Sequence, residues 1–330
     1  MGTSAPDAAA YRQRLEQTVA RLRSLPLHRL DSDTDLLNEA FGIACSAGLF
    51  ALHTFDPELR NALKFELFST LPSCSGSLAF LAVQILAANR IMQSDGFPQA
   101  ERYYRQRCGI AVNHLRAPVT VVGATKSKGG YRLTGRLTWA SGYGIFDTLV
   151  IGFHHEGREL QAVVPFAPQP GFDIGDPVEA FVGRSLNTVD IDLEGYELPA
   201  ENIVSSHPIG HYTRQKSVSR TVHFALYGIG LGAIDALEDG EVKREAALRL
   251  EARKEAFMAT DDGEEMDRLR VTLFDLVQRI VTTGMVLRGG SSILSERRLQ
   301  RYYRELILFN SNGLNETIKG LFKTAFLQCT

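Results

Sequence analysis

The spacing of apolar residues changes twice along this sequence, and no other feature constrains its fold as strongly. In residues 11–22 apolar side chains recur every three or four positions, which places them on one helix face. In residues 189–194 apolar and acidic residues alternate, as in a strand with one buried face. Helical spacing returns after Pro208, most clearly in residues 266–287. The sequence therefore predicts an α+β multi-domain fold, with an N-terminal helical domain, a middle antiparallel β domain and a C-terminal helical bundle.

The two changes of period also predict the domain boundaries. We expect the N-terminal helical domain over residues 1–108, the middle β domain over residues 109–206 and the C-terminal helical domain over residues 207–330. The triplet Lys128-Gly129-Gly130 predicts a hairpin turn within the β domain. Further helices are expected at residues 78–91, 99–106, 217–237, 241–258, 297–309 and 314–326.

Charge and cysteine content exclude several classes of partner. The formal net charge of -2 gives no basic field for nucleic acid. The four cysteines form no Cys-x-x-Cys pair, so neither a zinc site nor a disulfide framework is expected, and no metal is predicted. The longest mostly apolar stretch, residues 78–89, is shorter than the roughly 20 residues that a membrane span needs. With no secretory signal at the start, we expect a cytoplasmic protein that binds no membrane.

Three motifs occur in one order across nearly the whole chain. The first is a hairpin, G-G-Y-R-L-T-G-R-L-T-W-A-S-G, at residues 129–142. The second, G-R-S-L-N-T-V-D-I at residues 183–191, leads into L-P-A-E-N-I-V at residues 198–204. The third is R-G-G-S at residues 288–291 with R-Y-Y-R-E at residues 301–305. In content and order these motifs resemble those of the acyl-CoA dehydrogenase superfamily.

This resemblance implies a flavin, either FAD or the alternative FMN, and it implies residues that contact it. Trp139 matches the family's tryptophan beside the isoalloxazine ring, and Ser141 matches the hydroxyl that bonds the ring near N5. Asn113, with His114 after it, matches the strand that faces the flavin pyrimidine. Each has an ordinary alternative: Trp139 as a core residue, Ser141 as a turn residue and Asn113 as a polar group at a strand end.

The carboxylate that the family uses as a general base has no counterpart in this sequence. The usual glutamate position falls on Gly313, or on Asn312 if the register slips by one residue. The position that a minority of the family uses falls on Ser219 or Arg220. None of these side chains accepts a proton near neutral pH as a carboxylate does. The sequence therefore predicts a divergent member without the usual catalytic Glu.

Two other side chains are weak candidates for a general base. His223 lies about one helical turn beyond the minority position at Ser219 or Arg220. A histidine with apolar neighbours on a helix is, however, more often a packing residue. Glu316 is close in sequence to the usual glutamate position at Gly313 but out of register with it. The catalytic group is therefore unknown, with His223 as the weak candidate.

The resemblance leaves three functions open. The first is a flavin-dependent oxidoreductase acting on an acyl thioester, carried on CoA or a carrier protein, or on a similar organic substrate. Residues 114–118 run from the first strand straight into a proline, where the family has a longer phosphate-binding loop. A short connection here is similar to that of the monooxygenase branch of the superfamily. The second function is therefore a monooxygenase that uses reduced flavin. The third is a non-catalytic binding or partner subunit. Family members are commonly oligomers, so a homo-dimer or homo-tetramer is expected.

Two glycine-containing segments need only structural explanations. Residues 228–232, G-I-G-L-G, resemble a dinucleotide loop but lie in a helical run with no preceding strand, so they predict close helix packing. Gly289-Gly290 is predicted to end a helix.

Overall fold

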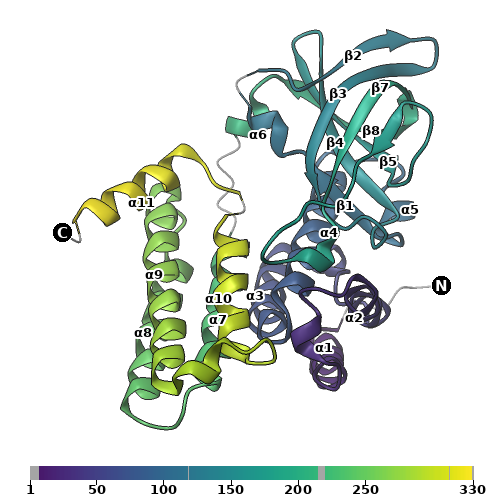
Figure 1. Cartoon of the computed structure of the whole chain (residues 1–330). Coiled ribbons are helices and arrows are strands. Elements are labelled where there is room, and N and C mark those ends of the chain that lie inside the picture. Colours follow the sequence, from purple (N-terminus) through teal and green to yellow (C-terminus); the bar gives the residue numbers. More distant parts are fainter. Residues whose placement is uncertain (1–6, 118, 215–219, 312, 329–330) are drawn as a thin grey trace.

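The computed structural model describes residues 7–117, 119–214, 220–311 and 313–328, and it has the α+β fold class that the sequence predicts. An N-terminal helical part, a β part and a C-terminal helical part follow one another along the chain. In Figure 1 the β part lies above the N-terminal helices, and the C-terminal helices stand beside them. The proposed boundaries at residues 108 and 206 stay predictions.

The N-terminal helices begin at side-chain caps. Asp33 and Asp56 accept hydrogen bonds from the backbone N–H groups of Leu36 and Leu59, which satisfies donors that a helix start leaves unpaired. The helices of this part are α1 (Ala8–Arg23), α2 (Thr34–Ser46), α3 (Pro57–Cys74), α4 (Gly76–Ser94) and α5 (Ala100–Tyr104).

The β part is one sheet of eight strands in the order β6-β7-β3-β2-β4-β5-β8, with β1 paired to β4 in parallel. The predicted hairpin turn joins β2 to β3, which pair antiparallel with Ser127 opposite Gly130. The strands are β1 (Cys108–Ala111), β2 (Val122–Ser127), β3 (Gly130–Ala140), β4 (Thr148–His155), β5 (Arg158–Pro165), β6 (Phe172–Ile174), β7 (Val189–Pro199) and β8 (Ile203–Pro208).

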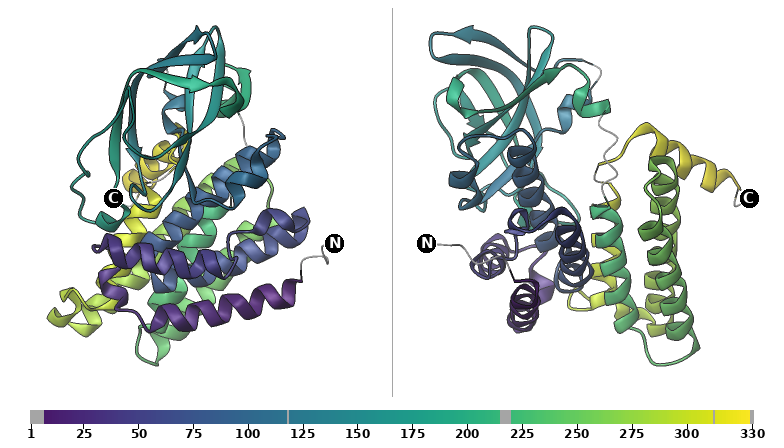
Figure 2. Two further views of the ribbon diagram at one scale, coloured as in Figure 1. Left: turned by 90° about the vertical axis from the view of Figure 1, so that its right-hand side faces the viewer. Right: turned by 180° about the vertical axis from the view of Figure 1, so that it is seen from behind.

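The C-terminal part is helical, as predicted, and two views of it are given in Figure 2. Its longest helix ends at Gly289, whose φ of 74° suits a glycine, as the sequence predicts. The expected helix at residues 217–237 is described only from Thr221 onward, because residues 215–219 lie outside the described ranges. The helices are α6 (His211–Arg214), α7 (Thr221–Asp235), α8 (Glu241–Ala259), α9 (Gly263–Arg288), α10 (Arg298–Asn310) and α11 (Glu316–Gln328).

Glycines let α7 pack closely against its neighbours. A Cβ atom on Gly228 would lie 2.3 Å from the backbone oxygen of Phe68 in α3, and one on Gly232 would lie 2.6 Å from the hydroxyl of Tyr302 in α10. The glycine segment lies inside a helix, so the prediction of close helix packing is confirmed. Among the described helices, none is both long and apolar enough to cross a membrane.

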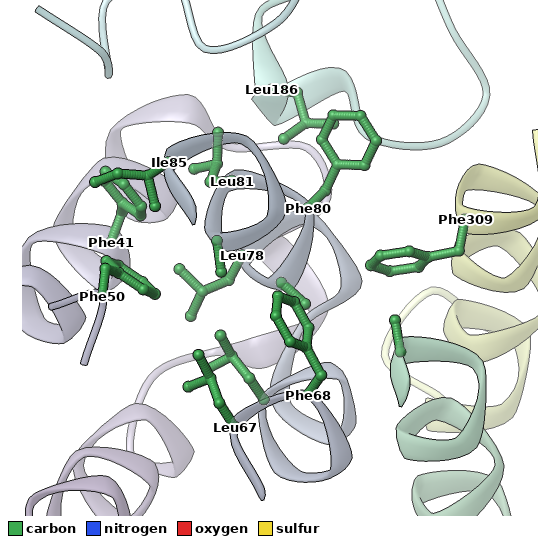
Figure 3. Close-up of a cluster of buried hydrophobic side chains, with 14 of the residues drawn as sticks. Phe41, Phe50, Leu67, Phe68, Leu78, Phe80, Leu81, Ile85, Leu186 and Phe309 are labelled. Carbon is green, nitrogen blue, oxygen red and sulfur yellow. The ribbon is translucent and has the colours of Figure 1, made fainter. Parts of the chain in front are cut away.

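An apolar cluster joins the three parts of the chain. Figure 3 shows Phe68 from α3, Phe80 from α4, Phe309 from α10 and Leu186 from a short 3-10 helix before β7. The rings of Phe80 and Phe309 meet edge to face with centroids 6.3 Å apart. Burying such side chains removes apolar surface from water, at about 1.5–3 kcal/mol for each large side chain. The core therefore fixes the β part against both helical parts.

A buried group of charged residues crosses the same junction. Asp31 accepts a hydrogen bond from the backbone N–H of Gly183, at 2.6 Å, and forms an ion pair with Arg304 of α10. Arg301, one turn earlier, donates to the backbone oxygens of Ser73 and Cys74 at the end of α3. Glu305 is fully buried with its carboxylate 3.7 Å from the Arg301 Nε atom. This burial raises the pKa of the Glu305 carboxyl to about 7.

Candidate functional site

A β-bulge near the end of β3 sets the conformation of Trp139. Leu137 pairs with Ile191 and Ala140 with Val189, so β3 carries one residue more than β7 between these pairs. Trp139 lies in the extra segment and has a φ of 62°. A positive φ is uncommon for a bulky residue, and such strain costs on the order of 1–3 kcal/mol. Bulges of this kind re-aim side chains, and strained residues gather at functional sites.

The Trp139 side chain at the bulge is exposed, and a carboxylate holds the Trp139 backbone in place. The Trp139 side chain is 64% exposed, which is unusual for the chain's only tryptophan. Its backbone N–H donates to Asp190 Oδ1 at 3.2 Å, and the other oxygen of Asp190 lies 3.0 Å from Arg136 Nη2. The alternative that Trp139 is a core residue therefore does not fit the structure.

A pair of hydroxyl groups lies next to the bulge. Ser141 is 5% exposed, and its Oγ atom lies 2.9 Å from Thr188 Oγ1. The next residue, Gly142, has a φ of 90° and donates its N–H to the backbone oxygen of Leu186 at 2.6 Å. Since each hydroxyl both donates and accepts, one O–H of the pair is left to bond a further group. Trp139 and Ser141 thus lie two residues apart at the end of β3, and the structure adds Thr188 as the partner of Ser141.

Asn113 does not lie on a strand, contrary to the sequence prediction. β1 ends at Ala111, and Asn113 begins a 3-10 helix that runs to Arg116. Because it has left the sheet, its side chain is exposed, and no described contact joins it to Trp139 or Ser141. The neighbouring His114 is held by a 2.8 Å contact between its Nε2 atom and the backbone oxygen of Gly152. A flavin role for Asn113 stays a prediction.

His223 lies inside the helical part, on α7. Its Nε2 atom is 2.8 Å from the backbone oxygen of Met266, and its ring packs against Phe257 with centroids 5.7 Å apart. Burial lowers the pKa of His223 to about 4, so the imidazole is neutral and weakly basic near neutral pH. These contacts are those of a packing residue. The role of His223 as a base stays a prediction, and the described contacts do not connect it to Trp139.

The other positions considered for a base contribute no carboxylate to this site. Gly313 has a φ of 60° and no side chain, while Asn312 and Ser219 lie outside the described residues. Arg220 forms an ion pair with Asp261 at 2.7 Å. Glu316 pairs with Lys319 on α11, at 2.7 Å.

Sequence reasoning missed Thr188 and Asp190, which hold the two predicted residues. The signal was present in the alternation of residues 189–194, which predicts that Asp190 points away from the buried face. The pairing register of β3 with β7 was not available from that alternation alone. Only the register places Asp190 opposite the bulge.

Comparison with known proteins defines the class of fold. No family model matches the sequence, and no curated protein matches it. Among solved structures, the chain has the fold of the acyl-CoA dehydrogenases, so the predicted resemblance is confirmed at the level of fold.

Three solved structures illustrate the likeness. KijD3, in complex with FMN and dTDP-3-amino-2,3,6-trideoxy-4-keto-3-methyl-D-glucose, has a TM-score of 0.76 and 20% identity, over 99% of this chain and 96% of that chain. Butyryl-CoA dehydrogenase from Megasphaera elsdenii has a TM-score of 0.74 and 15% identity, over 99% and 100%. The 3-HSA hydroxylase from Rhodococcus sp. RHA1 has a TM-score of 0.70 and 15% identity, over 98% of both chains.

Proposed function

We propose that this protein is a flavin-dependent oxidoreductase acting on an acyl thioester or a similar organic substrate, without a catalytic Glu. The observation that carries the proposal is the strained, exposed Trp139 two residues before the buried Ser141, whose hydroxyl contacts that of Thr188. Strained backbone conformations cluster at active sites and ligand-binding sites. The fold shared with flavin-binding KijD3 and with butyryl-CoA dehydrogenase agrees with this ligand.

The residues present fit a flavin. The Trp139 indole would cover one face of the ring system and exclude water from it, since aromatic rings stack in offset pairs. Ser141 would donate its hydroxyl to the ring edge, with Thr188 holding the hydroxyl in place. Asp190 would act as a positioning residue through the Trp139 backbone. The flavin supplies the redox chemistry when bound. FMN and FAD are both compatible with these contacts.

A second candidate is a reduced-flavin-dependent monooxygenase. The connection between β1 and β2 runs only from Val112 to Val121 and contains the short 3-10 helix Asn113–Arg116. The chain as a whole is also similar in fold to the 3-HSA hydroxylase. A monooxygenase of this kind needs no carboxylate to remove a proton from carbon. This agrees with the sequence, which has no carboxylate at the expected base positions. A non-catalytic partner subunit is the function that remains if no flavin binds.

The test of the flavin site is the affinity of the purified protein for FMN and FAD. Trp139→Ala and Ser141→Ala should each weaken binding and change the absorbance spectrum of bound flavin. Phe326→Ala, which removes an exposed aromatic side chain on α11, is the matched control and should leave both unchanged. Unchanged affinity and spectrum in both site variants would refute the proposal.

Two assays separate the candidate activities. Reduction of bound flavin by an acyl-CoA supports the dehydrogenase-type reaction. NADH consumption that requires a separate flavin reductase supports the monooxygenase. A protein that binds neither FMN nor FAD would leave the non-catalytic alternative.

We also propose that the protein is a homo-dimer or homo-tetramer. Large apolar side chains are exposed at the end of α9 and just after it, including Val286, Leu287 and Ile293. Exposed apolar patches of this kind commonly mark protein interfaces. Sedimentation equilibrium should give a mass of two or four chains, and a monomer at all concentrations would contradict this proposal. A cytoplasmic location stays a prediction.

A further inference from the structure

A tight turn leads into Thr188, and its backbone is strained. Residues 183–187, which we call the junction turn, contain the 3-10 helix Arg184–Leu186 between two residues of positive φ. These are Gly183, with a φ of 69°, and Asn187, with a φ of 46°. A positive φ is uncommon for a residue other than glycine, and it persists where the surrounding contacts over-determine it. The contacts of the junction turn therefore decide its position.

The N-terminal part of the chain holds the start of the junction turn. Asp31 is 2% exposed, and its Oδ1 atom accepts the backbone N–H of Gly183 at 2.6 Å. The backbone oxygen of Asp31 accepts the N–H of Ser185 at 3.1 Å. The Ser185 hydroxyl, which is fully buried, donates to the backbone oxygen of Leu30 at 2.6 Å. Three hydrogen bonds thus tie the turn to a segment that is distant in sequence.

Two helices in turn hold the Asp31 carboxylate. Its Oδ1 atom also accepts the hydroxyl of Ser77, in the first turn of α4, at 3.3 Å. Its Oδ2 atom forms an ion pair with Arg304 of α10. Hydrogen bonds to an ionised group are stronger and shorter than those between neutral groups. The carboxylate therefore fixes Gly183 relative to both helices.

The end of the junction turn bonds to the segment after β3. The backbone oxygen of Leu186 accepts the N–H of Gly142 at 2.6 Å, and the Asn187 Nδ2 group donates to the backbone oxygen of Tyr143 at 2.8 Å. The Leu186 side chain is 2% exposed and belongs to the apolar cluster in Figure 3. The turn is thus fixed at one end by Asp31 and fixes Gly142 at the other.

These bonds lie directly beside the hydroxyl pair of the site. Gly142 follows Ser141, and Asn187 precedes Thr188. The two hydroxyls, which are 2.9 Å apart, are therefore each one residue away from a residue that the junction turn bonds or contains. A displacement of the turn would change the distance between the hydroxyls and the direction of the O–H that is left for a ligand.

We propose, on the basis of the proposed function, that Asp31 is a positioning residue for the flavin site. It acts through the junction turn on the Ser141–Thr188 hydroxyl pair. The N-terminal helical part thereby sets the geometry of a site whose side chains come from the β part.

Two hydroxyl deletions of equal size separate positioning from general stability. Ser185→Ala removes the bond between the junction turn and Leu30, whereas Ser77→Ala removes a bond to the Asp31 carboxylate without touching the turn. Both serines are fully buried, so a purely structural role predicts that the two variants behave alike. Asp31→Asn is the third variant, which keeps an acceptor for Gly183 and removes the charge that pairs with Arg304. Circular dichroism checks that the variants fold.

The first measurement is hydrogen–deuterium exchange of the full-length protein without flavin, followed by mass spectrometry in a peptide that contains Gly142 and Tyr143. Ser185→Ala and Asp31→Asn should each raise the exchange rate there at least about threefold, as expected for the loss of one buried hydrogen bond. Ser77→Ala should leave the rate near that of the wild type. No rise in Ser185→Ala, or an equal rise in both serine variants, would overturn the proposal.

The second measurement is the affinity for FMN and the absorbance spectrum of bound FMN in the same proteins. Ser185→Ala and Asp31→Asn should weaken binding and shift the spectrum in the same direction as Ser141→Ala, while Ser77→Ala changes neither. A shift in Ser141→Ala without one in Ser185→Ala and Asp31→Asn would overturn the proposal and leave the proposed function standing. A wild-type protein that binds neither FMN nor FAD would refute the proposed function, and the exchange rates would still decide whether Asp31 fixes the hydroxyl pair.

Discussion

Replacing the buried Glu305 by Gln should make the stability of the protein less dependent on pH. Glu305 lies at the junction of the three parts of the chain, fully buried beside Arg301. Glutamine has nearly the same shape and imitates the protonated carboxyl. Arg301 keeps its bonds to the backbone oxygens of Ser73 and Cys74 in the variant, so its charge stays solvated by the protein.

The magnitude follows from the pKa of this carboxyl, which burial raises from 4.5 to about 7. A raised pKa means that the folded state holds the proton more tightly than the unfolded chain. The stabilisation is therefore complete below the unfolded pKa and is lost as the pH rises through the folded pKa. The loss amounts to about 3 kcal/mol above neutral pH, since each pKa unit corresponds to about 1.4 kcal/mol.

The assay is urea unfolding of both proteins at about pH 5 and about pH 8, with the free energy of unfolding taken from the linear dependence on urea. The free energy of unfolding of Glu305→Gln, measured relative to the wild type, should rise by about 2–3 kcal/mol from the acidic to the alkaline condition. Glu296→Gln, at an exposed position, is the control and should show no such change. A stability difference that is the same at both pH values would refute the reasoning.

Three further predictions concern the bulge and the helices. Asp190→Ala removes the acceptor of the Trp139 N–H, so it should cost about 1 kcal/mol of stability and weaken flavin binding in a fluorescence titration. Gly228→Ala places a Cβ atom 2.3 Å from a backbone oxygen of α3, so it should lower the free energy of unfolding by about 1–3 kcal/mol, whereas Gly240→Ala, with open space around it, should change it little. His223→Ala should lower the melting temperature through lost packing and leave flavin reduction measurable, because a group with a pKa of about 4 is a weak base near neutral pH; complete loss of reduction with flavin still bound would contradict this.

The fold class could be predicted from the sequence because it depends on local periodicity. Alternating apolar residues in β7 and the three-and-four spacing in α9 each depend on neighbours within one element. Gly289 marks the end of α9 for the same local reason. These signals are local, so no long-range contact is needed to detect them.

The site was less accessible to sequence reasoning because it depends on pairing between distant segments. Trp139 and Ser141 were found from a motif, but the bulge that exposes the indole arises from the register between β3 and β7. Asn113 was placed on a strand that in fact ends two residues earlier, because the apolar run continues through Val112 into the 3-10 helix.

The central claim is that the exposed indole of Trp139 covers a bound flavin, and the protein's own fluorescence tests it directly. Trp139 is the only tryptophan, so its emission reports on this position alone. Titration with FMN or FAD should quench that emission in a saturable way, with the same dissociation constant that flavin absorbance gives. Flavin that binds, as measured by ultrafiltration, while the tryptophan emission stays unchanged would contradict the account.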